Sequence, residues 1–242
     1  MKVLAFDTET TGLPENYNAS VTDSSKWPYI IQLSFIVFDT EEKEILDYSD
    51  RIIKLASTIT IPPESIAIHQ INRERSEREG ISISDALCEF SEAIKSVDFI
   101  VAHNLSFDKK MMLVELNRQK MPNCFIRPNG NGNGVWVKEY CTMQNTIDIC
   151  KMPNPNKKYT EQYKWPRLNE LHKHLFGSEP KGTHNAIADV MICLRCYVYL
   201  KCNYDIAIDQ EVKMVFRCLY ASYCLGDTPP RPLLGDTPPR PL

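Results

Sequence analysis

The chain has 242 residues, of which 43% are hydrophobic and 24% are charged, and its formal net charge is −3. This is enough chain for one sizeable core, or for one domain with appendages. The slightly acidic balance excludes an overall basic field that would attract nucleic acid. No apolar run approaches the ~20 residues that a membrane helix needs, and Asp7 comes too early for a signal-peptide core.

The nine cysteines are odd in number and lack the spacing of a disulfide framework. We therefore expect free thiols in a reducing intracellular compartment, with cytoplasm and nucleus both open. Cys193 and Cys196 are three residues apart, which is a spacing that zinc sites use. They lie in an apolar helical stretch, which favours buried core thiols over a metal site.

The first part of the chain predicts an antiparallel meander. Residues 2–8 form an apolar run that ends in acids, which predicts a central strand with Asp7 and Glu9 near its C-terminal end. Side chains two apart on a strand face the same side, so both carboxylates point to one place. Residues 29–38 and 44–54 predict the next two strands, which are joined by a hairpin turn.

Helices follow this meander. Pro62 and Pro63 are expected to open a helix near 64–69. Ser82 is expected to begin the next helix, whose apolar face runs over 86–97.

A buried strand is then predicted over 99–102, and Asp108 is expected to begin a helix over 109–119. Asp108 would therefore lie between the end of a strand and the start of a helix. That is the usual place for a ligand site in an open α/β sheet.

The second half of the chain contains two unusual loops. The Asn-Gly run over 129–134 predicts the tip of a β-hairpin or a flexible excursion. The basic, aromatic segment over 151–167 fits two interpretations: a track for a phosphate backbone and bases, and a solvated loop with Trp165 tucked into the core. Further helices are predicted over 168–176, 184–202 and 206–223.

The end of the chain repeats the sequence LGDTPPRPL without change, over Leu225–Leu233 and Leu234–Leu242. A segment so rich in proline cannot build a core and is expected to be extended or disordered. A duplication without function and an adaptor-binding proline motif are both consistent with it. We therefore divide the chain into a main domain over 1–205, a helix over 206–224 that packs on it, and a tail over 225–242.

Acidic and histidine residues from three distant motifs supply the candidate site. Four carboxylates whose immediate motifs contain no basic residue are costly to bring together, unless cations occupy the space between them. Hard oxygen ligands suit Mg²⁺ or Mn²⁺, and a histidine beside such a site indicates an acid–base group. The pattern predicts two-metal phosphodiester hydrolysis. Its residues are Asp7, Glu9, Asp108, His184 and Asp189.

The order and surroundings of these motifs resemble those of the DEDDh exonucleases, the family of the bacterial DNA polymerase III epsilon subunit. The resemblance covers residues 1–202 and implies an RNase H-like α/β fold, with a five-stranded mixed sheet flanked by helices. It implies that the four acids bind two Mg²⁺ or Mn²⁺ ions, and that His184 acts as the base from a flexible lead-in. A related subclass carries tyrosine four residues before the last acid. Asn185 stands there in this chain, which indicates the histidine subclass.

The resemblance implies a 3′–5′ exonuclease that releases 5′-mononucleotides from single strands in proofreading, repair or degradation. DNA is favoured because the motifs and the segment over 164–171 look like the proofreading group. The same chemistry on RNA, in processing or turnover, is the first alternative. The second is a polymerase-associated or adaptor-binding module that uses the proline-rich tail.

The resemblance also implies substrate contacts at Thr8, Thr10, Leu13, His69, Asn104 and Phe107. Loop packing is the alternative for Leu13, and core packing is the alternative for Phe107. His69 matches an Ile-His-Gly motif in which Gln70 replaces the glycine. We interpret His103 as structural, and His172 and His174 as surface positions on a polar helix.

Overall fold

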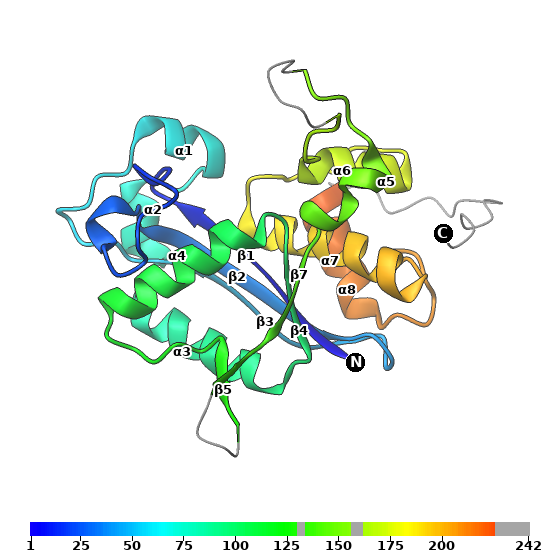
Figure 1. The fold of residues 1–242 in the computed structure, drawn as a ribbon, viewed down its shortest axis with the longest axis horizontal. Coiled ribbons are helices and arrows are strands. Elements are labelled where there is room, and N and C mark those ends of the chain that lie inside the picture. The colour runs from blue at the N-terminus through cyan, green and yellow to red at the C-terminus, as the bar shows by residue number, and fades with distance from the viewer. Residues whose placement is uncertain (130–133, 156–161, 226–242) are drawn as a thin grey trace.

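The computed structural model describes residues 1–129, 134–155 and 162–225, arranged around a central sheet (Figure 1). The strand order is β3-β2-β1-β4-β7. β1 and β3 pair antiparallel with β2, whereas β4 and β7 extend the sheet with parallel pairing. The predicted α/β class, with a five-stranded mixed sheet flanked by helices, is confirmed. The strands are β1 (Lys2–Thr10), β2 (Ile30–Asp39), β3 (Glu44–Ile52), β4 (Phe99–Ala102) and β7 (Lys138–Cys141).

Alternate residues of β1 enter two different cores, one on each face of the sheet. Leu4 and Phe6 belong to the core under α3 (Ile83–Ala93) and α4 (Leu105–Arg118). Val3 and Ala5 belong to the core under α7 (Ala186–Cys202). Because this alternation continues along the strand, Asp7 and Glu9 lie on the α7 face. β2 is buried along its whole length, since helices cover both of its faces.

The remaining helices are short. The helix α2 was not predicted, because its sequence RERSERE has no apolar stripe. Asn72 caps it by accepting from the Arg75 amide at 2.9 Å. These helices are α1 (Pro63–His69), α2 (Arg73–Glu79), α5 (Ile147–Cys150), α6 (Leu168–Phe176) and α8 (Met214–Tyr220). Single turns are η1 (Ser24–Lys26), η2 (Ile94–Ser96), η3 (Gln144–Thr146) and the π-helical turn η4 (Ala221–Leu225).

Three predicted helix boundaries were wrong. α4 begins at Leu105, so Asp108 lies inside its first turn rather than before it. α7 begins at Ala186 rather than at residue 184, so His184 lies on the lead-in to the helix, where it was expected as the base. The single helix expected over 206–223 is instead a series of turns followed by α8 and the π-helical turn. Local sequence signals predict that a helix is present more reliably than they predict where it begins and ends.

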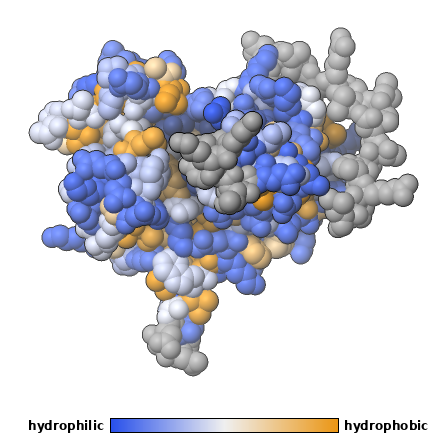
Figure 2. All heavy atoms as spheres, turned by 45° about the horizontal axis from the view of Figure 1, so that its top comes forward, coloured by the Kyte–Doolittle hydropathy of each residue, from blue (hydrophilic) through white to orange (hydrophobic). Residues whose placement is uncertain are grey.

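The hairpin expected around 129–134 is present as β5 (Ile126–Pro128) and β6 (Gly134–Trp136), which pair antiparallel. Its tip at 130–133 lies outside the described residues, as do residues 156–161 of the basic loop and the tail after Leu225. None of the helices in the described part of the chain combines the length and apolar character that a membrane span requires. The face shown in Figure 2 is largely hydrophilic, with hydrophobic residues scattered over it.

Candidate active site

The acidic residues meet at the C-terminal end of β1. One carboxylate oxygen each from Asp7, Glu9 and Asp189 lies within 4.8 Å of the others. Asp189 reaches this point from the first turn of α7, the helix that covers the Asp7 face of the sheet. Two strand residues and one helix residue therefore converge from opposite ends of the sequence.

Asp108 approaches the same point from the other side of β1. The strand β4 pairs only with Val3 to Ala5, so the edge of β1 beyond Ala5 is free on that side. There the backbone amide and the hydroxyl of Thr8 donate to Asp108 Oδ1 at 3.1 and 2.8 Å. Thr8 is buried, and its role in the structure is to hold this carboxylate.

Burial raises the pKa of all four carboxylates, and the charges of neighbouring acids add to the shift at Asp7, Glu9 and Asp108. Burial, followed by the charges of the other three acids, raises the pKa of Asp7 well above its usual value. Burial and the charges of Asp189 and Asp108 raise the pKa of Glu9 to about 8. Burial raises the pKa of Asp108 and of Asp189 to about 7, although hydrogen bonds from Thr8 and His184 oppose the shift.

No ion pair between described residues involves these four acids, so their charge has no protein counter-ion there. Several hard oxygen atoms converging without a cation form a donor set that fits Mg²⁺ or Mn²⁺. The site therefore fits the metal ions that the sequence pattern predicted.

His184 lies on the lead-in to α7, where its backbone has φ 68° and its side chain is exposed. Its amide donates to Asp189 Oδ2 at 3.0 Å, so the residue is tied to the acidic cluster. The lead-in itself rests on the C-terminal π-helical turn. A side chain at Gly182 (φ 74°) would place its Cβ 2.2 Å from the Tyr223 carbonyl oxygen, and the Lys181 amide donates to the Cys224 carbonyl at 2.8 Å.

Asp7 and Asp189 line a cleft of about 570 Å³. Trp165 stands in its wall with 58% of its surface exposed, which contradicts the interpretation that it is tucked into the core. His103 ties this wall to the sheet, with Nε2 3.0 Å from the Pro166 carbonyl and Nδ1 2.9 Å from the Thr142 hydroxyl. Burial lowers the pKa of His103 to about 4, so it is neutral and structural. The cleft is lined by Asp7, His103, Asn104, Met143, Trp165, Pro166, Arg167, Leu168, Asn169, Thr183, His184 and Asp189.

The six residues expected to contact substrate lie in different surroundings. Asn104 is exposed in the cleft wall. Leu13 is 73% exposed, which contradicts loop packing, and it lines a neighbouring hollow with Trp27. Phe107 is half-buried, and its ring centroid lies 6.5 Å from that of Tyr17.

The other three turn toward the protein. Thr8 holds Asp108, and the Thr10 hydroxyl donates to the Gly12 carbonyl at 2.7 Å. His69 is buried, and its Nδ1 accepts from the Ile71 amide at 3.0 Å. Gln70 adopts the left-handed conformation (φ 62°) that a glycine adopts without strain.

Two polar residues of β2 support the site and were not predicted. Gln32 and Ser34 pair with Glu9 and Asp7 in the sheet, so they face α7. Both donate to Asp50 Oδ1, at 2.7 and 2.6 Å, and Gln32 also accepts from the Ala186 amide at 3.4 Å. They link the sheet to the start of α7. Two polar side chains at alternate positions of an otherwise apolar strand were the signal that could have identified them.

Comparison with known proteins identifies the family. The family model described as "Exonuclease" (RNase_T) matches residues 4–197. No curated protein matches the chain by sequence.

Solved structures share the fold. E. coli exonuclease I bound to a dT13 oligonucleotide is 16% identical with a TM-score of 0.60, over 91% of this chain and 43% of that one. A product-bound exonuclease I is 14% identical with a TM-score of 0.59, over 83% and 43%. The chain thus spans less than half the length of exonuclease I. A 3′-exonuclease that recognises the 3′ end of a histone mRNA stem-loop is 13% identical with a TM-score of 0.58, over 84% and 82%.

Proposed function

Because this chain belongs to the exonuclease family, we propose that it is a metal-dependent 3′–5′ exonuclease of the DEDDh type. The observation that carries the proposal is the acidic cluster, in which oxygens of Asp7, Glu9 and Asp189 lie within 4.8 Å beside Asp108. Such a cluster without a protein counter-ion is stable only when cations or protons balance it.

The four acids would hold two Mg²⁺ or Mn²⁺ ions. Bound there, these ions would supply charge stabilisation of the transition state and activation of the attacking water. Asp7, Glu9 and Asp189 provide oxygen ligands, and Thr8 orients Asp108 through two hydrogen bonds.

His184 is proposed to take the proton from the attacking water. Its side chain is exposed, so the imidazole can turn toward a bound phosphate while the lead-in stays in place. The hydrogen bond that its backbone amide donates to Asp189 keeps it within reach of the acids.

The terminal nucleotide is proposed to lie in the cleft between Asn104 and Trp165. The exposed face of Trp165 suits stacking on a base, and the Asn104 amide can hydrogen-bond to the sugar or phosphate. Neither contact depends on which base is present, which is consistent with degradation that does not depend on sequence.

The favoured substrate is the 3′ end of single-stranded DNA, in proofreading, repair or degradation within a reducing intracellular compartment. RNA is the alternative, and structures with this fold include one bound to a DNA oligonucleotide and one that recognises an RNA stem-loop. The tail over 225–242 is proposed as a tether to a polymerase or adaptor. Deleting residues 225–242 tests this role. Loss of the partner with an unchanged nuclease rate would support a tether, and no change in either would show that the tail is inert.

The first test uses 5′-labelled single-stranded DNA and RNA of one sequence, with Mg²⁺, with Mn²⁺ and with EDTA. We expect a metal-dependent ladder of products that are shortened from the 3′ end. The strand that is degraded faster decides between DNA and RNA. Asp7→Asn should abolish it, whereas Asp47→Asn, an exposed acid on β3, should not. Cleavage from the 5′ end, or no cleavage with any metal, would overturn the proposal.

A further inference from the structure

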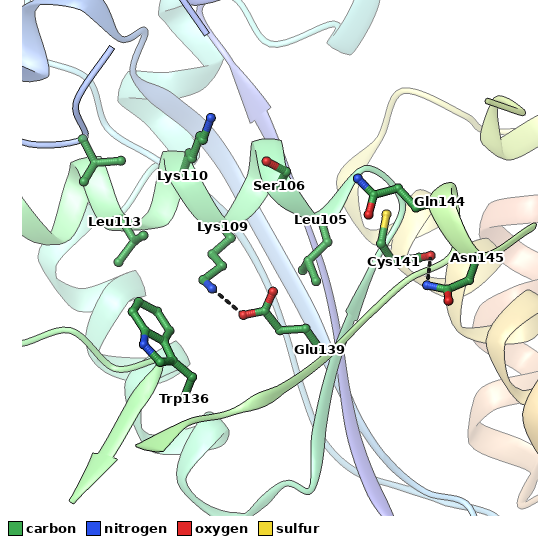
Figure 3. Close-up of a pocket in the computed structure, with 11 residues that line it drawn as sticks. Leu105, Ser106, Lys109, Lys110, Leu113, Trp136, Glu139, Cys141, Gln144 and Asn145 are labelled. Atoms are coloured by element: carbon green, nitrogen blue, oxygen red, sulfur yellow. Dashed lines mark hydrogen bonds and ion pairs between the residues drawn. The ribbon is translucent and has the colours of Figure 1, made fainter. Parts of the chain in front are cut away.

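A second hollow of about 440 Å³ lies beside the cleft, between α4 and the strands β6 and β7 (Figure 3). It is open to solvent and holds none of the acidic residues of the candidate active site. Its polar and aromatic lining is supplied by Ser106, Lys109, Lys110, Trp136, Glu139, Gln144 and Asn145.

The hollow continues the cleft along two walls. The cleft includes Asn104 and Met143, and the hollow includes the next residues along the chain, Leu105 with Ser106 and Gln144 with Asn145. From Asn104 to Lys110 the helix advances about 9 Å, at ~1.5 Å for each residue. A strand that leaves the cleft in this direction would therefore enter the hollow within a few nucleotides.

Trp136 supplies the aromatic surface of the hollow, with 48% of its side chain exposed on β6. The Lys109 ammonium lies 4.1 Å from the centre of its ring and forms an ion pair with Glu139, so the charge of Lys109 is balanced (Figure 3). Trp136 keeps its exposed surface in the presence of this lysine contact.

Lys110 supplies the free charge. It extends away from Glu139 (Figure 3) and donates to the Tyr17 carbonyl at 2.8 Å, and no ion pair among the described residues involves it. An exposed aromatic ring, an unbalanced cation and two side-chain amides are what proteins use to bind single strands without sequence preference.

We propose that this hollow binds the single strand a few nucleotides upstream of its 3′ end, with Trp136 stacking on a base and Lys110 contacting a phosphate. This proposal rests on the proposed exonuclease function. It adds a strand-binding site beyond the cleft, and it predicts that long strands are held better than short ones.

The test compares a long 5′-labelled single strand with the p-nitrophenyl ester of thymidine 5′-monophosphate, which is too small to reach beyond the cleft. Trp136→Ala should raise KM for the long strand about tenfold, since stacking on an aromatic side chain commonly contributes that much. Trp136→Ala should hydrolyse the ester at the same rate as wild type. Val135→Ala is the matched control, because Val135 is 53% exposed on the same strand and faces the other way.

Two further variants make the result specific. Trp136→Phe should restore most of the affinity, because it keeps an aromatic face. Lys110→Ala is combined with Asp7→Asn to prevent cleavage. The slope of the logarithm of the binding constant against the logarithm of the salt concentration should become shallower by about 0.7, because one phosphate contact on a single strand contributes that much. Anisotropy of a labelled strand measures both effects.

The outcomes separate the two proposals. If wild type cleaves neither substrate, the exonuclease function fails. If wild type degrades the long strand and Trp136→Ala does so with the same KM, only the strand-binding site fails. An effect of Trp136→Ala confined to substrates with a duplex end would assign the hollow to the complementary strand and overturn the proposal.

Discussion

Two groups of charged residues are buried along α7, and they differ in how their charge is balanced. At the start of the helix, Asp189 joins three other acids without a described basic partner. Farther along, Arg195 forms an ion pair with Asp205 at 2.6 Å and donates to the Tyr220 hydroxyl at 2.9 Å. Burial opposes the charge of Arg195, but Asp205 and Tyr220 raise its pKa.

The balanced group is structural. Its His172 is buried between Tyr220, at 2.8 Å, and the Ser178 carbonyl, at 2.7 Å, so the expectation that His172 lies on the surface was wrong. His174 is exposed, as predicted. The group connects α6, α7 and α8 and needs no ligand. The acidic group, by contrast, is left with a net charge that a ligand must balance, which is typical of functional sites.

The largest contrast is expected from removing one carboxylate of the acidic group. Asp7→Asn should lower the exonuclease rate by at least about 10²–10³-fold, because in the proposed function it removes a metal ligand that stabilises the transition state. The same change should raise the melting temperature in EDTA, because it relieves repulsion. Rate assays and thermal melts of one preparation check both. A lower melting temperature in EDTA would contradict the account of an unbalanced charge.

Removing a carboxylate from the balanced group should do the opposite. Asp205→Asn leaves the Arg195 charge buried without its partner, so the free energy of unfolding should fall by about 3–5 kcal/mol. Urea denaturation in the presence of Mg²⁺ measures it. Glu179→Gln, in the exposed pair with Lys173, is the control and should have no measurable effect. Equal free energies of unfolding for Asp205→Asn and wild type would show that the ion pair between Arg195 and Asp205 does not stabilise the fold.

The two groups are joined through the C-terminal turn on which Gly182 rests. Gly182→Ala would clash with the Tyr223 carbonyl and displace His184, so activity should fall about 10–100-fold. Gly177→Ala is matched to it, since Gly177 has a similar φ of 76° but open space around it. Steady-state rates of both variants, measured after confirming that each is folded, should show the loss only for Gly182→Ala. Equal activities would mean that the turn does not position the base.

The smallest contrast is in the dependence of stability on pH. Raised pKa values, about 8 for Glu9 and about 7 for Asp108 and Asp189, add stability at low pH that is lost as the pH rises through 7–8. In EDTA, stability should therefore fall by at least about 1 kcal/mol between pH 6.5 and 9, and Mg²⁺ should restore it.

The stability that the balanced group contributes depends on pH with the opposite sign. Burial lowers the pKa of His172 to about 4, so its contribution is complete above pH 6.5 and is lost as the pH falls through 4. Thermal melts from pH 4 to 9, with EDTA and with Mg²⁺, separate the two groups. A metal-free protein whose stability is flat from pH 6.5 to 9 would contradict the shifted carboxylates.

Local patterns in the sequence predicted much of this molecule. The apolar run before Asp7 predicted β1, and alternation along the strand predicted that Asp7 and Glu9 share a face. Turn signals predicted the meander of β1, β2 and β3. These features depend on residues close in the chain. The burial of His172 could not be predicted in this way, because its partner Tyr220 lies 48 residues away.

The sequence by itself determined which acids and which histidine form the candidate site, since their order and neighbours carry the family pattern. Only the tertiary structure decided how they meet. Packing of α4 and α7 on opposite faces of the sheet brings residues 7, 108 and 189 together, and Thr8 holds Asp108 across 100 residues of chain. No local period encodes such distances, because they depend on how separate elements pack. The left-handed lead-in of His184 likewise depends on a C-terminal turn that follows it by some 40 residues.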